Sequence, residues 1–167
     1  MLSEELKSVL EDPNIFHYQH LWLKEDNAEQ RDVLELFAFG SFNDLNSHSQ
    51  LASRLTELML MKLRKQTIIS LSESYREVSY DMIRKSCQMN DSHDIEVMLI
   101  QLRDILQIRL DSVKETVTFT QCHNCRDVYT HERDLRVVNE GNIVTKDKLL
   151  KNLNSWKRKL LDDILSV

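Results

Sequence analysis

Apolar residues recur at helical spacing over most of the chain. Between residues 1 and 40 they form short runs, the first of which ends at Pro13 and the last at Gly40. The polar stretch 41–49 predicts a loop, and the apolar residues of 55–75 predict one long helix or two in succession. The pattern therefore predicts a stack of short helices followed by a longer one.

Two shorter helices and a hairpin are expected after the long helix. Ser79 is the expected N-cap of the first, and one of residues 90–92 caps the second, whose apolar positions run from Ile95 to Ile108. Apolar and polar residues then alternate up to Phe119, which predicts two short strands. Three helices followed by a hairpin are the outline of a winged helix.

The end of the chain shows the most regular helical pattern, with Thr145 as the expected N-cap. Its apolar stripe consists of Leu149, Leu150, Leu153, Trp156, Leu160, Leu161, Ile164 and Leu165. The expected polar face is basic, with Lys148, Lys151, Lys157, Arg158 and Lys159. Such a helix either folds onto its own domain or docks with partners, and the basic face favours an acidic partner.

Composition supports one compact, mainly helical unit. The chain has 167 residues, of which two are glycine and one is proline, and sheets joined by tight turns need more of both. The net charge is −5, and residues 1–45 hold ten acids against three bases, which is −7 for that part and +2 for the rest. An acidic protein gains little from phosphate neutralisation, so we expect no nucleic-acid partner.

The expected compartment is cytoplasmic and nuclear. Three cysteines are too few for a disulfide framework, which indicates a reducing environment. The N-terminal segment 1–13 mixes acids into its apolar positions, so it predicts neither a signal peptide nor a membrane span, and we expect no membrane partner.

The stretch Cys122-His123-Asn124-Cys125 contains a Cys-x-x-Cys pair, the sequence signature of several metal and thiol sites. A structural zinc site needs a second pair of ligands, which would have to come from Cys87, His93 and His131 or from His17 and His20. Haem attachment requires histidine where Arg126 stands, and a thioredoxin-like site requires a parallel sheet. We expect two small, buried or half-buried residues at a strand end, with no metal and no cofactor.

Signatures of catalysis and of DNA recognition are also missing from the sequence. The histidines at 17, 20 and 48 have no serine or cysteine nucleophile and no carboxylate pair at a useful spacing, and no His-Glu-x-x-His or P-loop motif occurs. A DNA-reading helix at 93–107 would carry Asp94, Glu96 and Asp104 against Arg103 alone. We predict that the chain is neither an enzyme nor a DNA-binding winged helix.

Four motifs occur in one order along the chain: Phe37-Ala38-Phe39-Gly40-Ser41-Phe42 with Asp44, Thr67-Ile68-Ile69-Ser70-Leu71, Val78-Ser79-Tyr80 and Arg126-Asp127-Val128. In this order the sequence resembles PCI-domain proteins, a family of scaffold subunits shared by the proteasome lid, the COP-nine signalosome and translation initiation factor three. Within the family it is similar to the seventh-subunit branch of the signalosome. Its short length and acidic start are most similar to the small ninth-subunit branch of budding yeasts.

The resemblance implies a helical-repeat stack ending in a winged helix, with a repeat that is cut short here. We expect a truncated repeat over 1–54, the winged helix over 55–128, and a linker with the C-terminal helix over 129–167. The implied function is that of a non-catalytic scaffold subunit supporting removal of the ubiquitin-like protein Nedd from cullins. A subunit of the proteasome lid or of initiation factor three is the alternative within the family, and a nucleic-acid-binding winged helix lies outside it.

The resemblance also implies the partners. They are other PCI-domain subunits, an MPN-domain isopeptidase of the same complex and, indirectly, a cullin-RING ubiquitin ligase. Pairing between winged helices assigns the wing residues Val113, Val117 and Phe119 to a partner interface. A bundle of C-terminal helices assigns the same role to Leu149, Leu153, Trp156, Leu160 and Ile164.

Overall fold

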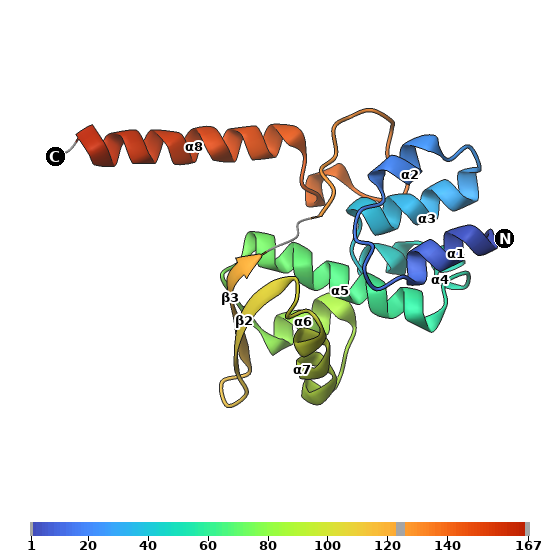
Figure 1. The fold of residues 1–167 in the computed structure, drawn as a ribbon, viewed down its shortest axis with the longest axis horizontal. Coiled ribbons are helices and arrows are strands. Elements are labelled where there is room, and N and C mark those ends of the chain that lie inside the picture. Colours follow the sequence, from blue (N-terminus) through green and yellow to red (C-terminus); the bar gives the residue numbers. More distant parts are fainter. Residues whose placement is uncertain (1, 123–125, 166–167) are drawn as a thin grey trace.

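The computed structural model of the chain describes residues 2–122 and 126–165, arranged as a helical body from which one long helix projects (Figure 1). The N-terminal part contains α1 (Glu4–Glu11), α2 (Gln19–Lys24), α3 (Ala28–Phe39), the 3-10 helix η1 (Asp44–Ser47) and α4 (Ser49–Ala52). The rest contains α5 (Glu57–Ser74), β1 (Glu77–Ser79), α6 (Tyr80–Cys87), α7 (Ser92–Gln101), β2 (Leu106–Asp111), β3 (Thr116–Cys122), the 3-10 helix η2 (Glu140–Asn142) and α8 (Lys146–Leu165). The mainly helical fold class, with a small wing and a C-terminal helix, is confirmed.

The helices begin where the sequence offers capping side chains. The Ser79 hydroxyl accepts a hydrogen bond from the Met82 amide at 3.3 Å, and the Asp91 carboxylate accepts one from the His93 amide at 3.0 Å. Each bond satisfies an amide of the first turn that has no partner within the helix. Both predicted caps are confirmed.

Gly40 ends α3 as predicted, but for a reason of packing. Its φ of −79° is open to any residue, so a left-handed turn is not required. A Cβ at this position would lie 2.8 Å from both the Cδ1 and the carbonyl oxygen of Leu36. Glycine therefore allows the chain to pass close over the last turn of α3.

The winged helix carries a three-stranded antiparallel sheet in the order β1-β3-β2. Strand β1 was not predicted, because its short sequence was interpreted only as the approach to the Ser79 cap. The prediction that the helix before the hairpin reaches Ile108 is also wrong. This helix, α7, ends at Gln101, and Leu106 already belongs to β2. A continuous apolar run fits a buried helix and a buried strand equally well.

Val113 was predicted to lie in a wing strand. It lies instead in the turn between β2 and β3, where the residue is 96% exposed. The Asp111 carboxylate accepts a hydrogen bond from the Lys114 amide at 3.0 Å, and Glu115 takes the left-handed φ of 48°. Local side-chain bonding of this kind favours a turn over a strand.

Two hydrophobic cores share the long helix α5. Met59 and Leu63 pack into the core of the N-terminal helices, whereas Ile68 and Ile69 pack into the core of the winged helix. The expected boundary at residues 54 and 55 therefore does not separate two independently packed units, because α5 contributes side chains to both cores.

Residues 126–145, called the strap below, return from the wing across the N-terminal helices to the start of α8 (Figure 1). Tyr129, Val138 and Ile143 of the strap are buried in the N-terminal core. Because these side chains pack inside, the expectation of a linker after residue 128 is wrong for this segment.

Helix α8 projects from the body and contains no buried residue over Lys146–Leu165 (Figure 1). None of the helices in the described part of the chain has both the length and the apolar character that a bilayer crossing needs.

Candidate partner-binding site

Arg126 is the centre of a buried polar junction between the N-terminal helices, α5 and the strap. Its guanidinium donates hydrogen bonds to the carbonyl oxygens of Phe37, Ala38, Gly40 and Gln66 and to the Ser70 hydroxyl, at 2.9–3.1 Å. Its amide donates to a Glu73 carboxylate oxygen at 2.7 Å. Burial lowers the pKa of Arg126 to about 10, which leaves the side chain charged at neutral pH.

Asp127 connects the strap to the start of α2. Its carboxylate accepts hydrogen bonds from the amides of Tyr18 and Gln19, at 2.6 and 3.1 Å, and lies 3.1 Å from Nδ1 of His17. The amides are the ones that the first turn of α2 leaves unpaired. Asp127 therefore caps α2 from more than 100 residues away in the sequence.

Three of the four motifs meet at this junction. Arg126 binds carbonyl oxygens of the first motif, and the Phe42 amide donates to the hydroxyl of Thr67 in the second motif at 2.9 Å. The remaining motif lies apart, with Val78 and Tyr80 buried in the winged-helix core. Three of the motifs therefore consist of residues that contact one another in the folded chain. The burial of Arg126 was not predicted.

Two further contacts hold the strap against the body. The buried Glu35 carboxylate accepts hydrogen bonds from the amides of residues 136–138, at 2.7–3.1 Å. The Arg133 guanidinium donates to the carbonyl oxygens of Trp22 and Glu25, at 2.9 and 3.0 Å, at the end of α2. The strap is therefore fixed along its length by charged groups that bind backbone atoms.

The start of α8 is fixed by the strap. The Thr145 hydroxyl accepts from the Lys148 amide at 3.2 Å, which confirms the predicted N-cap. The Lys148 ammonium donates to the carbonyl oxygens of Gly141 and Ile143, at 2.8 and 2.9 Å. These bonds set the direction in which α8 leaves the body.

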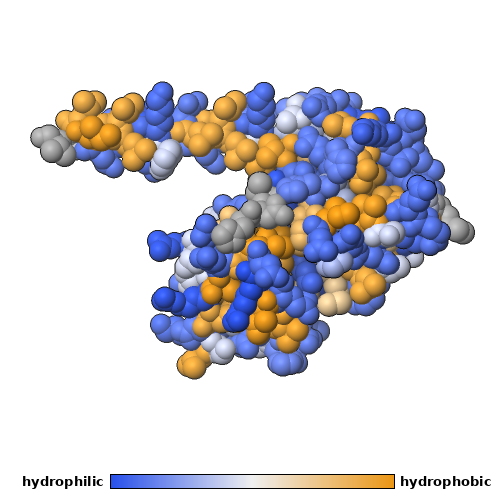
Figure 2. Space-filling view, in the orientation of Figure 1, coloured by the Kyte–Doolittle hydropathy of each residue, from blue (hydrophilic) through white to orange (hydrophobic). Residues whose placement is uncertain are grey.

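The surface of α8 carries an uncovered apolar stripe along its length (Figure 2). Its eight residues are 39–82% exposed: Leu149, Leu150, Leu153, Trp156, Leu160, Leu161, Ile164 and Leu165. Trp156, in the middle, is 62% exposed. A contiguous exposed apolar surface of this kind marks an interaction site. The structure thus places the five predicted α8 residues on one accessible surface.

The wing residues are divided between the surface and the core. Val117 is fully buried and Phe119 is 7% exposed, both within the winged-helix core, so their side chains hold the fold and are not accessible to a partner. Assigning them to an interface was wrong, because alternation along a strand does not say which face is covered. Val113 is exposed at the tip of the wing, and β2 forms an edge of the sheet.

The Cys-x-x-Cys stretch is only partly described. Cys122 ends β3 as an exposed residue, which confirms the strand end but not the expected burial. His123, Asn124 and Cys125 lie outside the described residues. Over residues 2–122 and 126–165 no group of three or more histidine, cysteine or acidic side chains is arranged to hold a metal ion.

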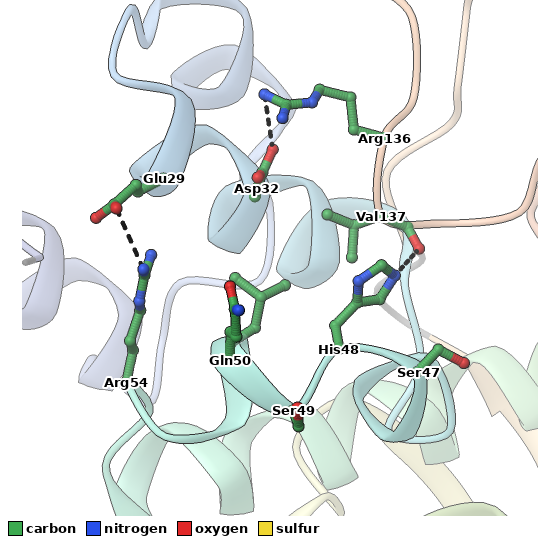
Figure 3. A pocket seen from close by; sticks show the side chains of 10 residues that line it. Glu29, Asp32, Ser47, His48, Ser49, Gln50, Arg54, Arg136 and Val137 are labelled. Carbon is green, nitrogen blue, oxygen red and sulfur yellow. Dashed lines mark hydrogen bonds and ion pairs between the residues drawn. The ribbon is translucent and has the colours of Figure 1, made fainter.

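A polar pocket of about 490 Å³ lies between α3, α4 and the strap (Figure 3). Its charged side chains pair with one another: Arg54 lies 3.2 Å from Glu29, and Arg136 lies 3.5 Å from Asp32. Nε2 of His48 lies 3.1 Å from the Val137 carbonyl oxygen. The contacts of Arg136 and His48 join the strap to the helices, and Arg54 joins the segment after α4 to α3. The charges of this pocket therefore support the fold.

Comparison with known proteins identifies the family. The family model of the PCI domain matches residues 7–121, which span the N-terminal helices and the winged helix. The chain belongs to the PCI-domain family. The match ends before Arg126, so the strap and α8 lie outside it.

Three relatives match 95–99% of the chain. It is 42% identical over 165 residues to COP9 signalosome complex subunit 9 of Saccharomyces cerevisiae, covering 99% of each chain. It is 29% identical to the protein of that name from Eremothecium gossypii, covering 96% of this chain and 97% of the relative. It is 24% identical to COP9 signalosome complex subunit 7 of Dictyostelium discoideum, covering 95% of this chain and 61% of the relative. Similarity to both signalosome branches is confirmed.

Proposed function

We propose that this PCI protein is a non-catalytic scaffold subunit of a COP9 signalosome. The observation that carries the proposal is the full-length similarity at 42% identity to a protein named as subunit 9 of that complex. The fold agrees with a role in assembly, since the apolar stripe of α8 is accessible and no residue of α8 belongs to either core.

The proposed partners are other PCI-domain subunits and an MPN-domain isopeptidase of the same complex. Through them the chain supports removal of the ubiquitin-like protein Nedd from cullins in cullin-RING ubiquitin ligases. The protein is proposed to occur in the cytoplasm and the nucleus, because its three cysteines indicate a reducing environment.

Helix α8 is the proposed anchor in the complex, with Leu149, Leu153, Trp156, Leu160 and Ile164 as contact residues. Covering exposed apolar side chains is favourable by about 25 cal/mol per Å² of surface removed from water. An interface built on this stripe therefore gains from the surface that the isolated chain leaves exposed.

The test is purification of the tagged protein from its native cell at moderate salt, with the co-purified proteins identified by mass spectrometry. We expect other signalosome subunits together with a cullin. Recovery of proteasome-lid or initiation-factor subunits would keep the fold and overturn the function. In the same experiment, Trp156→Asp with Leu160→Asp should abolish recovery of the other subunits, and unchanged recovery would remove α8 as the anchor.

A nucleic-acid function has no support in the winged helix. The helix α7 presents Asp94 with the apolar residues Val97 and Ile100 on its exposed surface, and the phenol of Tyr80 donates to Glu96. A DNA-reading helix needs basic side chains at such positions.

A further inference from the structure

One basic residue of α8 lies within the apolar stripe. Side chains three and four residues apart are neighbours on the surface of a helix. For Lys157 these neighbours are Leu153, Asn154, Leu160 and Leu161. The prediction that Lys157 belongs to the opposite, polar face is therefore wrong, and a partner that covers the stripe also covers Lys157.

Lys151 provides a contrast on the same helix. Its neighbours at these spacings are Asp147, Lys148, Asn154 and Ser155, all of which are polar. Both lysines are exposed in the isolated chain and carry the same charge. They differ in whether covering the apolar stripe removes them from water.

An ammonium group removed from water needs a nearby negative charge, because an unpaired buried charge is strongly unfavourable. The acids of α8 are Asp147, Asp162 and Asp163. None lies three or four residues from Lys157, so none is its neighbour on the helix. The compensating carboxylate must therefore come from the partner.

The charge of α8 also argues against a second copy of the same helix as that partner. Its bases are Lys146, Lys148, Lys151, Lys157, Arg158 and Lys159, and six bases against three acids give a net charge of +3. Two such helices repel each other, whereas a helix rich in aspartate and glutamate is attracted.

The stripe continues onto the body at the start of α8. A hollow of about 600 Å³ there is lined by the apolar residues Val128, Ile143 and Val144 of the strap and by Leu149 of α8, beside Glu73 of α5. A helix lying along the stripe therefore finds an apolar contact on the body at one end. This continuity favours a partner helix over a short peptide.

We propose that α8 binds an acidic amphipathic helix of a neighbouring subunit, and that a carboxylate of this helix pairs with Lys157. The proposal rests on the proposed function, because the neighbour is a subunit of the same complex. Lys157 then selects the partner and its alignment along the stripe, as a single polar residue does within a coiled-coil seam.

The experiment compares two charge reversals in the tagged chain expressed in its native cell. Lys157→Glu places a carboxylate against the acidic partner and should lower recovery of the other signalosome subunits by about tenfold or more. Lys151→Glu makes the same charge change on the polar face and should leave recovery within about twofold. Lys157→Arg keeps the charge and should retain assembly.

The outcomes separate this inference from the proposed function. Equal recovery with Lys157→Glu and Lys151→Glu would overturn the inference. If recovery is lost only with Trp156→Asp and Leu160→Asp, α8 is still the anchor but Lys157 does not select the partner. Sedimentation of the purified chain adds a second test: self-association that Trp156→Asp and Leu160→Asp abolish would identify a second copy as the occupant and overturn the acidic partner.

Discussion

The strap and α8 follow one another in the sequence, but side chains of the strap are buried in the body whereas those of α8 are exposed. Arg126 of the strap binds four carbonyl oxygens and a hydroxyl inside the chain, and Tyr129 and Val138 fill its core. In α8, by contrast, Lys146–Leu165 contains no buried residue. A segment whose polar groups find partners within the chain maintains the fold, whereas a segment with an uncovered apolar stripe is available for assembly.

Arg126→Met should produce the largest loss of stability. It leaves the carbonyl oxygens of Phe37, Ala38 and Gly40 buried without the guanidinium that binds them. Removing one side of a buried charged network costs about 3–5 kcal/mol. Chemical denaturation followed by circular dichroism measures this loss.

The matched control is Arg158→Met on α8, which removes the same side chain from an exposed position and should change stability by less than about 0.5 kcal/mol. A loss below about 1 kcal/mol for Arg126→Met would mean that the junction does not hold the strap.

Glu35→Gln should have the next largest effect. Glutamine lacks the negative charge of the carboxylate that accepts hydrogen bonds from the backbone amides of residues 136–138. The expected loss in the free energy of unfolding is about 1–3 kcal/mol. Hydrogen exchange should show faster exchange at these amides. Glu132→Gln, at an exposed position of the strap, is the control and should leave exchange unchanged. Equal protection in both variants would contradict the role of Glu35.

The burial of Lys62 should make a smaller, pH-dependent contribution to the stability of the protein. Lys62 is buried, its ammonium binds the Asp12 carbonyl oxygen and lies 4.4 Å from the centre of the Phe16 ring, and burial lowers its pKa from about 10.5 to about 8. Between these values the unfolded state holds more protons than the folded state. The stability of the wild type should therefore rise with pH above 8, relative to Lys62→Met, by at most about 1.4 kcal/mol per pH unit.

The comparison with Lys62→Met removes the contributions of other titrating groups that both proteins share. Burial also raises the pKa of Cys87 to about 12, which acts in the opposite direction at alkaline pH in both proteins. Denaturation curves from pH 7 to 9.5 test the effect. A difference between the two proteins that does not change with pH would show that Lys62 keeps its ordinary pKa.

Trp156→Asp with Leu160→Asp should have the smallest effect on the body while abolishing assembly. Both side chains are exposed, so the cooperative unfolding of the rest of the chain should change by less than about 0.5 kcal/mol. A loss of several kcal/mol would mean that α8 packs on its own body in solution, and would remove the contrast between the strap and α8.

Features that depend on local chemistry were predicted well. The caps at Ser79 and Thr145 and the helix end at Gly40 follow from interactions within a few residues. The amphipathic stripe of α8 is likewise visible in the spacing of its residues. Strand β1 and the end of α7 were missed, because three residues give no period and a continuous apolar run fits either structure.

The candidate site was predicted in part. The five α8 residues lie on one exposed surface, but Val117 and Phe119 are buried, since the sequence gives the alternation of a strand and not the element that covers each face. Lys157 was assigned to the wrong face, although its neighbours at helical spacing were available in the sequence.

The sequence by itself determined the helical class, the caps and the stripe of α8, because each depends on residues close together in the chain. It also contains the family motifs in their order. Only the tertiary structure decided that Arg126 and Glu35 are buried, that the strap belongs to the core and that α8 is left uncovered. A charged residue is ordinarily placed on the surface, and its burial depends on backbone groups that folding brings from distant parts of the chain.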